Sequence, residues 1–211
     1  MVYDLQLPAW KWPFYLVRHP FEGFEDLRWK KGYNMKVALV MVLVFFLATV
    51  IQARMTGFIF NNEYTKVFNI VPYFSSTVLL FFVWVVANWS LCTLFNGEGT
   101  MKAICCMSAY ALFPYVVAML VNTAASNVLL YREGGFLQFI AMLGLAWSVL
   151  MMISGIKAIH QYSVPKTLMA IAFTVLAMVV MLFIVVLLVA LFQQVYIFFY
   201  TIYTEIVYRI G

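Results

Sequence analysis

The feature that most limits the fold is a run of 38 residues, from 167 to 204, that contains no charged side chain. As a single α-helix this run would be about 57 Å long, whereas the hydrocarbon core of a bilayer is about 30 Å thick. The run must therefore bend, tilt strongly or leave the membrane, and we place that change at Gln193 and Gln194. Residues 193–211 are aromatic and amphipathic, which predicts an interfacial helix on which Glu205 and Arg209 pair across one turn.

Four more apolar runs precede this one, and each is close to the length that a helix needs to cross a bilayer. Residues of hydrophobic type make up 66% of the chain and charged ones only 10%, so lipid must cover much of the surface. The runs are continuous rather than alternating, which favours helices over a β-barrel. We therefore expect an all-α, polytopic transmembrane bundle of five spans within residues 35–192, with the lipid bilayer as its surroundings. The expected spans are 35–52, 73–95, 103–122, 136–158 and 167–192.

The first segment, residues 1–34, differs from the rest in its mixed charges and its many aromatic residues. Apolar residues at positions 10, 14, 17, 21 and 24 follow the spacing of one helix face. Pro13 and Pro20 divide the segment into short pieces, and Pro20 suits the first position of a helix that Gly32 would end. A tryptophan-rich amphipathic segment beside a span is typical of the membrane interface.

The distribution of Lys and Arg predicts the orientation of the spans. With the N-terminus in the cytoplasm, the cytoplasmic side holds nine of these residues and the outer side four. We therefore expect a cytoplasmic N-terminus and a C-terminus outside. The net charge of +5 is modest and the basic residues do not form a groove-reading pattern, so we expect no nucleic-acid partner.

A surface for a partner is expected on the cytoplasmic side, where charged and unusual residues gather. Glu98 lies in the loop 96–100, NGEGT, which is short enough to join two adjacent antiparallel helices. One interpretation is turn chemistry alone, with glycines ending one helix and Thr100 capping the next. The other is a docking or gating charge. The candidate docking residues are Arg28, Lys30, Lys31 and Glu98.

The predicted spans contain few polar side chains and no charged residue well inside them, which argues against ion-coupled transport. The polar candidates either join helices by hydrogen bonds or line a path for a neutral solute, and the first interpretation is the commoner one. Pro114 is expected to kink the third span. The intramembrane polar candidates are Asn88, Ser90, Tyr110 and Asn122.

Nothing in the sequence indicates catalysis, a cofactor or a metal ion. The three cysteines, Cys92, Cys105 and Cys106, lie within or beside apolar runs, as small buried residues do. His160 is expected near the cytoplasmic end of the fourth span, but no ligand spacing supports a metal site with these cysteines. No phosphate-binding glycine motif, zinc-protease signature or nucleophile elbow is present.

Three stretches resemble the Yip1 family: RHPFEGFEDLRWKKG (18–32), NWSLCTLFNGEGTMK (88–102) and YALFPY (110–115). The resemblance covers nearly the whole chain from about residue 14. It implies five spans, a cytoplasmic N-terminus, no cofactor and no known catalytic residue. Eukaryotic members are linked to Rab GTPases, vesicle traffic and membrane shaping, and carry a long cytosolic N-terminal region. With only about 36 residues there, this chain looks more like the short bacterial members of the plasma membrane, some of which accompany carbohydrate import systems.

Three functional hypotheses follow. The first is a non-enzymatic membrane scaffold or accessory subunit with a membrane-protein partner or a second copy of itself. The second is a passive or facilitative transporter for a neutral solute or lipid, with Asn88, Tyr110 and Asn122 lining its path. The third, a membrane enzyme, has least support, because no set of carboxylate, histidine and cysteine converges in the sequence.

Overall fold

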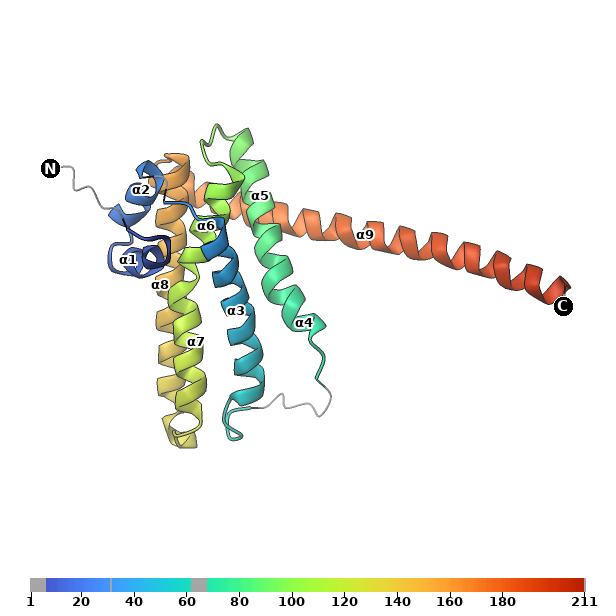
Figure 1. The fold of residues 1–211 in the computed structure, drawn as a ribbon, viewed down its shortest axis with the longest axis horizontal. Helices are drawn as coiled ribbons and strands as arrows, with labels where there is room; N and C mark the ends of the chain where they lie inside the picture. The colour runs from blue at the N-terminus through green and yellow to red at the C-terminus, as the bar shows by residue number, and fades with distance from the viewer. Residues whose placement is uncertain (1–6, 31, 62–67, 211) are drawn as a thin grey trace.

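The structure, a computed structural model, describes residues 7–30, 32–61 and 68–210, and it is helical throughout its regular elements (Figure 1). Two short helices precede a bundle of longer ones, and the last helix leaves the bundle. The elements are η1 (Ala9–Lys11), α1 (Trp12–Arg18), α2 (Glu22–Trp29), α3 (Met35–Met55), α4 (Val71–Phe74), the π turn η2 (Ser75–Leu79), α5 (Leu80–Leu94), α6 (Met101–Ala111), α7 (Phe113–Ser126), η3 (Tyr131–Glu133), α8 (Gly134–His160) and α9 (Val164–Ile210).

Five helical stretches of the described chain are long and apolar enough to cross a membrane. Each overlaps one predicted span, so the predicted fold class is confirmed and the protein is a multi-pass membrane protein surrounded by lipid. The stretches are Met35–Met55, Val71–Leu94, Met101–Ser126, Tyr131–His160 and Val164–Arg209.

The N-terminal helices lie against one end of the bundle (Figure 1). Helix α1 packs on α6 and α7, and α2 packs along α8. The assigned start of α2 is Glu22, but the Gly23 N–H already donates to the His19 carbonyl at 2.8 Å. Pro20 therefore lies in the turn that opens the helix, close to its predicted position.

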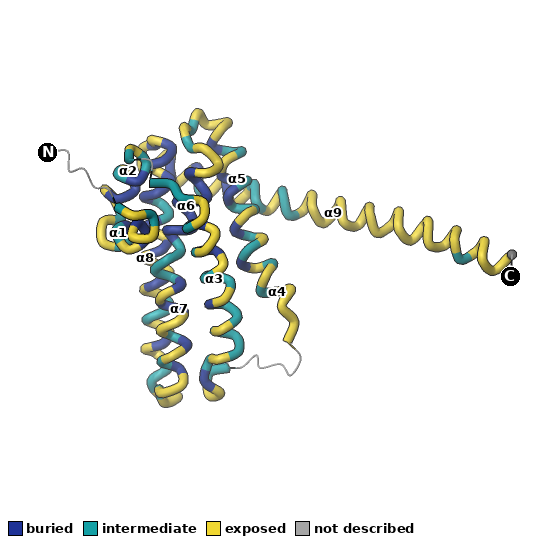
Figure 2. Tube along the Cα trace, in the orientation of Figure 1, coloured by how far each residue is buried: buried dark blue, intermediate teal, exposed yellow. Residues whose placement is uncertain are grey.

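Burial is concentrated at this same end of the bundle, which we call the cap (Figure 2). In α6 every residue from position 103 to 111 is buried. In α8 the buried residues gather toward the C-terminus, whereas the first half exposes large apolar side chains such as Phe136 and Phe139. The exposed half must be covered by lipid or by other protein helices, because so continuous an apolar surface is unfavourable in water. The cap core contains Trp12, Leu16, Phe24, Leu27, Ile104, Met107, Tyr110, Met151, Ile156 and Ile159.

Pro114 coincides with a division of the third span. Helix α6 ends at Ala111 and α7 begins at Phe113, so the break falls at Leu112. Proline has no N–H to donate and its ring crowds the carbonyl four residues earlier, which interrupts a helix at this point. The Val116 N–H resumes the ladder by donating to the Leu112 carbonyl at 3.0 Å.

Helix α9 extends sideways from the bundle at a steep angle to α3, α5 and α8 (Figure 1). Its first turns pack on α5, but none of residues 175–209 is buried. One helix runs through Gln193 and Gln194, so the run does not bend there, and the alternatives of a strong tilt or an exit from the membrane at these residues stay predictions. The reason is local: no Gly or Pro follows Pro165 before residue 211, and glutamine is itself a good helix former.

In the lipid-facing half, α7 and α8 approach each other closely at Gly144. A Cβ atom added to Gly144 would lie 2.2 Å from the Cβ of Ala118, so only glycine permits this approach. The same pair of helices is joined by the Ser148 hydroxyl, which accepts a hydrogen bond from the Tyr115 N–H at 3.0 Å.

Replacing Gly144 with alanine should therefore force α7 and α8 apart. We expect the free energy of unfolding to fall by about 1–3 kcal/mol, the usual cost of overpacking. Chemical unfolding in mixed micelles would measure the change. Gly135→Ala is the matched control, since a Cβ there meets nothing within 4 Å. Equal stability of both variants would contradict the close approach.

Candidate functional site

The Arg28 side chain joins α2, the end of α8 and the loop 96–100. Its guanidinium donates hydrogen bonds to the carbonyls of Ala158, at 3.0 Å, and Ile159, and it forms an ion pair with Glu98. The last carbonyls of α8 lack partners within the helix, and they attract a cation. Arg28 thus supplies hydrogen-bond donors to carbonyls at the C-terminal end of α8 and holds the loop 96–100 against that end.

The loop itself is shaped by Asn96. Asn96 adopts a left-handed conformation with φ of 54°, and the Gly97 N–H donates to the Cys92 carbonyl at 2.7 Å, which ends α5 in a Schellman arrangement. Asn96, rather than a glycine, therefore occupies the left-handed position that ends α5. Asparagine tolerates this conformation, so the interpretation that glycines end this helix is wrong. The predicted Thr100 cap is confirmed, since its hydroxyl accepts from the Ala103 N–H at 3.3 Å.

The two loop glycines have another role, which is close contact with the end of α8. A Cβ on Gly97 would lie 2.5 Å from both His160 Nδ1 and the Tyr162 hydroxyl. A Cβ on Gly99 would lie 2.5 Å from His160 Cε1. Neither position has room for a side chain, so the loop can close over the ring of His160 only with glycine at both positions.

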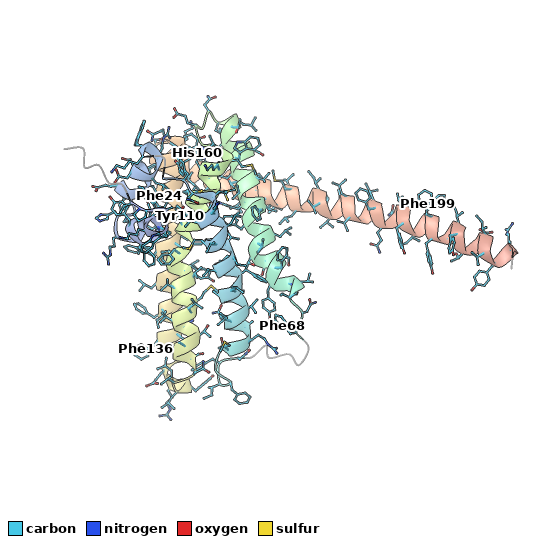
Figure 3. The ribbon with its side chains drawn as sticks, viewed as in Figure 1. Phe24, Phe68, Tyr110, Phe136, His160 and Phe199 are labelled. Carbon is cyan, nitrogen blue, oxygen red and sulfur yellow. The ribbon has the colours of Figure 1, made fainter. Side chains whose placement is uncertain are left out.

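His160 is at the centre of a chain of buried hydrogen bonds, at the same end of the bundle as Phe24 and Tyr110 (Figure 3). The Gly99 N–H donates to His160 Nδ1 at 3.3 Å, so Nδ1 carries no proton and Nε2–H faces Asn88 Oδ1 at 3.2 Å. The Asn88 amide donates to the Thr174 hydroxyl at 3.2 Å, and Thr174 donates to the Ala170 carbonyl at 2.7 Å. These bonds join α5, α8 and α9 through groups that are almost wholly buried.

Tyr162 provides a hydrogen-bond donor to the carbonyl groups at the C-terminal end of α5. Its hydroxyl lies 3.2 Å from the Cys92 carbonyl and 3.3 Å from the Phe95 carbonyl, and it donates its single proton to this pair. The ring stacks on His160, with centroids 5.3 Å apart, and the Lys166 ammonium lies 4.2 Å from the ring centre. Burial, together with nearby Cys92, raises the pKa of Tyr162, so its hydroxyl remains a donor.

The N-terminal segment has its own polar contacts. The Tyr15 hydroxyl donates to Asp26 Oδ2 at 2.9 Å, which ties α1 to α2. Burial and this neighbouring carboxylate raise the pKa of Tyr15 to about 12. Burial likewise raises the pKa of Tyr33 to about 12 despite the opposing effect of Arg28. Both hydroxyls therefore stay protonated at any physiological pH.

The candidate docking residues are used mainly inside the molecule. Arg28 and Glu98 contact each other, and Lys30 pairs with Asp26 at 3.1 Å. The fourth candidate, Lys31, lies outside the described residues.

The intramembrane polar candidates lie at separate places. Asn88 belongs to the His160 chain, while Ser90 is half-buried on α5. The Tyr110 hydroxyl donates to the Asn34 carbonyl at 3.4 Å. Asn122 lines a pocket of about 270 Å³ with Ser126 at the other end of α7, where its Oδ1 has no hydrogen-bond partner among the described residues. The four residues therefore form no common site.

Within the described ranges, no three His, Cys, Asp or Glu side chains come together as metal ligands would. Cys92, Cys105 and Cys106 are all buried and free. Sequence reasoning identified Asn88 and Glu98 but missed the partners that define the site: His160, Tyr162 and Thr174. The only signal in the sequence was that these residues are polar and lie beside apolar runs. Polarity alone does not specify which of them form hydrogen bonds with each other.

The five long apolar helices, together with a cap whose elements are joined by polar contacts, define a multi-pass helical membrane protein. The Yip1 domain matches residues 14–188, which is most of the chain, and the protein belongs to the Yip1 family. Members of this family are generally non-catalytic membrane-trafficking proteins. No curated protein and no solved structure matches the chain.

Replacing Arg28 with methionine should destabilise the cap. The change leaves the Ala158 and Ile159 carbonyls without their charged donor, so we expect a loss of about 1.5–3 kcal/mol in the free energy of unfolding. Glu98→Gln should cost less than about 1 kcal/mol, because 64% of the Glu98 side chain is exposed against 16% for Arg28. Unfolding in mixed micelles tests both, and equal losses would refute this division of roles.

Gly99→Ala should open the loop from His160 and so loosen the surroundings of Cys92, which is 1% exposed and whose carbonyl accepts from the Gly97 N–H of this loop. We expect faster maleimide labelling of Cys92, measured on the peptide by mass spectrometry. Gly135→Ala is again the control. Unchanged labelling of Cys92 in the Gly99 variant would show that the loop does not depend on this contact.

Proposed function

We propose that this protein is a non-enzymatic membrane scaffold or accessory subunit that binds another membrane protein along α9. The observation that supports this most is the exposure of α9: its mean hydropathy over the most apolar stretch is 3.4, and that stretch has no buried residue. An apolar surface of this extent must be covered by lipid or by other protein helices.

The length of α9 helps to decide whether lipid or protein covers this surface. The 47 residues of α9 give a helix of about 70 Å, more than twice the thickness of the hydrocarbon core. Lipid tails can cover only the part that lies within this layer. The remaining part needs a protein surface or the membrane interface.

The distal part of α9 is rich in aromatic side chains, which are enriched at the centres of protein interfaces. Tyr196 and Tyr200 stack with ring centroids 6.2 Å apart, and Phe199 lies far out on the helix (Figure 3). Most of these rings are more than half exposed: Tyr196, Phe198, Phe199, Tyr200, Tyr203 and Tyr208.

The proximal part of α9 supports the proposal in a different way, because it is firmly attached. Thr174 hydrogen-bonds to Asn88, and the Phe173 ring stacks on Phe95, directly after α5, at 5.8 Å. A scaffold has to hold its binding element in a defined direction, and these contacts supply that.

The N-terminal candidates enter this proposal as supports of the cap. Arg28 and Glu98 hold α8 and the loop together, so their substitution would affect a partner indirectly. A direct docking role for Lys30 and Lys31 stays a prediction.

The identity and location of the partner are also proposals. From the family resemblance and the distribution of Lys and Arg, we propose the bacterial type, with residence in the plasma membrane, a cytoplasmic N-terminus and an outer C-terminus. An importer of carbohydrates is the partner suggested by the family resemblance, and a second copy of this chain is the alternative. The division into residues 1–34, 35–192 and 193–211 remains a prediction too, although α9 crosses its second boundary without a break.

The alternative of a passive path for a neutral solute has less support. Asn88 and Tyr110 are fully buried and their side chains are hydrogen-bonded to protein groups. Asn122 lies at the opposite end of the third span in a separate pocket. No shared path lined by these three residues follows from their positions.

Leucine at four distal aromatic positions of α9 (Tyr196, Phe199, Tyr200 and Tyr203) tests the proposal. The change keeps the helix apolar but removes the rings, so membrane residence is preserved. We expect recovery of co-purifying membrane proteins, or of differently tagged copies, to fall about tenfold, equivalent to about 1.4 kcal/mol. The control is Phe136→Leu with Phe139→Leu on α8, where the rings are similarly exposed. Undiminished recovery with the α9 variant would reject α9 as the binding element.

A further inference from the structure

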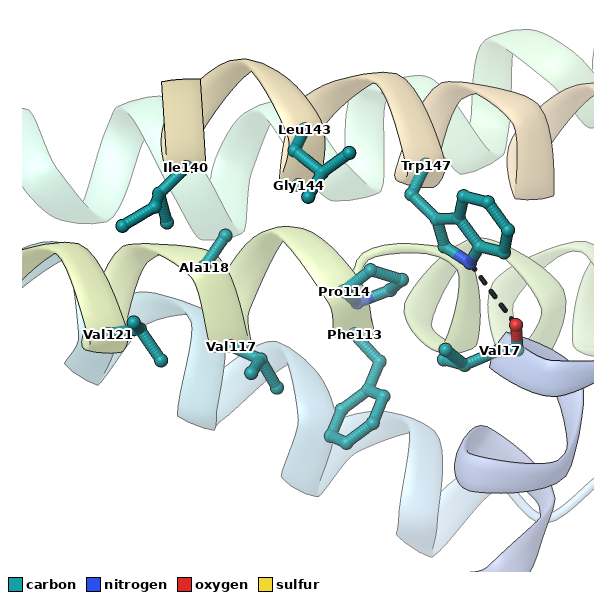
Figure 4. Close-up of a pocket in the computed structure, with 10 residues that line it drawn as sticks. All are labelled: Val17, Phe113, Pro114, Val117, Ala118, Val121, Ile140, Leu143, Gly144 and Trp147. Carbon is teal, nitrogen blue, oxygen red and sulfur yellow. Dashed lines mark hydrogen bonds between the residues drawn. The ribbon is translucent and has the colours of Figure 1, made fainter. Parts of the chain in front are cut away.

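An apolar groove of about 470 Å³ runs between α7 and α8 and ends at α1 (Figure 4). Its volume is within the range of known ligand pockets. Every lining residue is apolar or aromatic, and the floor is formed where Gly144 meets Ala118. The lining residues from α7 and α8 belong to two candidate spans, so the groove faces the interior of the membrane. Its natural occupant is therefore a hydrocarbon chain.

The groove is closed at one end by α1. The Trp147 indole N–H donates to the Val17 carbonyl at 3.2 Å, and Val17 itself lines the groove (Figure 4). The Phe14 ring packs edge-on against Phe113 at 4.8 Å. These contacts fix α1 across the groove, so an inserted chain would end beside this short helix.

Two exposed cations lie at the ends of α1, which forms the closed end of the groove, and α2, which packs on α1, carries the carboxylates of Glu22, Glu25 and Asp26. Arg18 directly follows Val17 and is exposed, and Lys11 is exposed at the start of α1. Between residues 7 and 21 the sequence contains no Asp or Glu; the first acidic residue after α1 is Glu22. A phosphate group at this end would therefore meet a cation without competition from a carboxylate of α1.

We propose that the groove binds one acyl chain of an anionic glycerophospholipid from the bilayer, with the headgroup phosphate beside Arg18. The apolar lining selects the chain, and the basic end selects the charge of the headgroup. The proposal is independent of α9 and of any protein partner. In this proposal α1 holds the headgroup at the closed end of a membrane-facing groove.

The full-length protein in bilayers of equal parts phosphatidylcholine and phosphatidylglycerol provides the test. Phosphatidylglycerol with a diazirine in the middle of one acyl chain is photolysed, and the adducts are located by peptide mass spectrometry. We expect adducts to concentrate on the groove residues Val117, Val121 and Leu143. An even distribution over the exposed apolar residues of α3, α8 and α9 would overturn the proposal.

Two variants with matched controls sharpen the result. Val121→Trp fills the groove and should lower groove adducts about tenfold, whereas Val40→Trp, on the exposed face of α3, should leave them unchanged. Arg18→Gln should reduce the preference for phosphatidylglycerol over phosphatidylcholine about fivefold, and Lys11→Gln should reduce it less.

Competition in the unaltered protein makes the test independent of the folding of any variant. Excess unlabelled phosphatidylglycerol should suppress the groove adducts more strongly than phosphatidylcholine does. Equal suppression by both lipids would refute the anionic preference. A cross-link that places a second copy of the chain in the groove would refute lipid as the occupant.

Discussion

The requirement that buried polar groups find partners governs the cap of this protein. His160 cannot face hydrocarbon with an unpaired ring nitrogen, and Asn88 cannot leave its amide unsatisfied in a packed core. Each meets this need through the other and through Gly99 and Thr174. As a result the loop 96–100, α5, α8 and α9 are joined at one point, and a displacement of any one of them would leave a buried donor or acceptor unpaired. The geometry of the cap follows from that constraint.

The lipid-facing half of the bundle is held differently. Apolar side chains there gain little by leaving lipid for protein, so close contact between helices has to supply the attraction. Gly144 permits that contact with α7, and Gly57 permits another, because a Cβ on Gly57 would lie 2.2 Å from the Ser126 carbonyl oxygen. The molecule thus has a cap fixed by hydrogen bonds and a membrane region fixed by small residues, and the apolar groove opens in the second of these.

Periodicity and local chemistry were enough to predict the five spans, the interruption near Pro114 and the role of Thr100 as the N-cap residue of α6. Each of these features depends on residues that are close in sequence. The pairing of Arg28 with Glu98 joins residues that are 70 positions apart, and no local pattern specifies it. The same is true of His160 and Asn88. For the run from 167 to 204, bilayer thickness indicated a bend, a strong tilt or an exit from the membrane, and the continuous helix excludes only the bend, because two glutamines do not break a helix.

The contacts of the cap also fix the first turns of α9 to the rest of the molecule. Arg28 on α2 holds the last turn of α8, the following Tyr162 holds the end of α5, and Thr174 on α9 is bonded to α5 through Asn88. The N-terminal helices and α9 are therefore linked through the same few buried groups, although their sequences are more than a hundred residues apart.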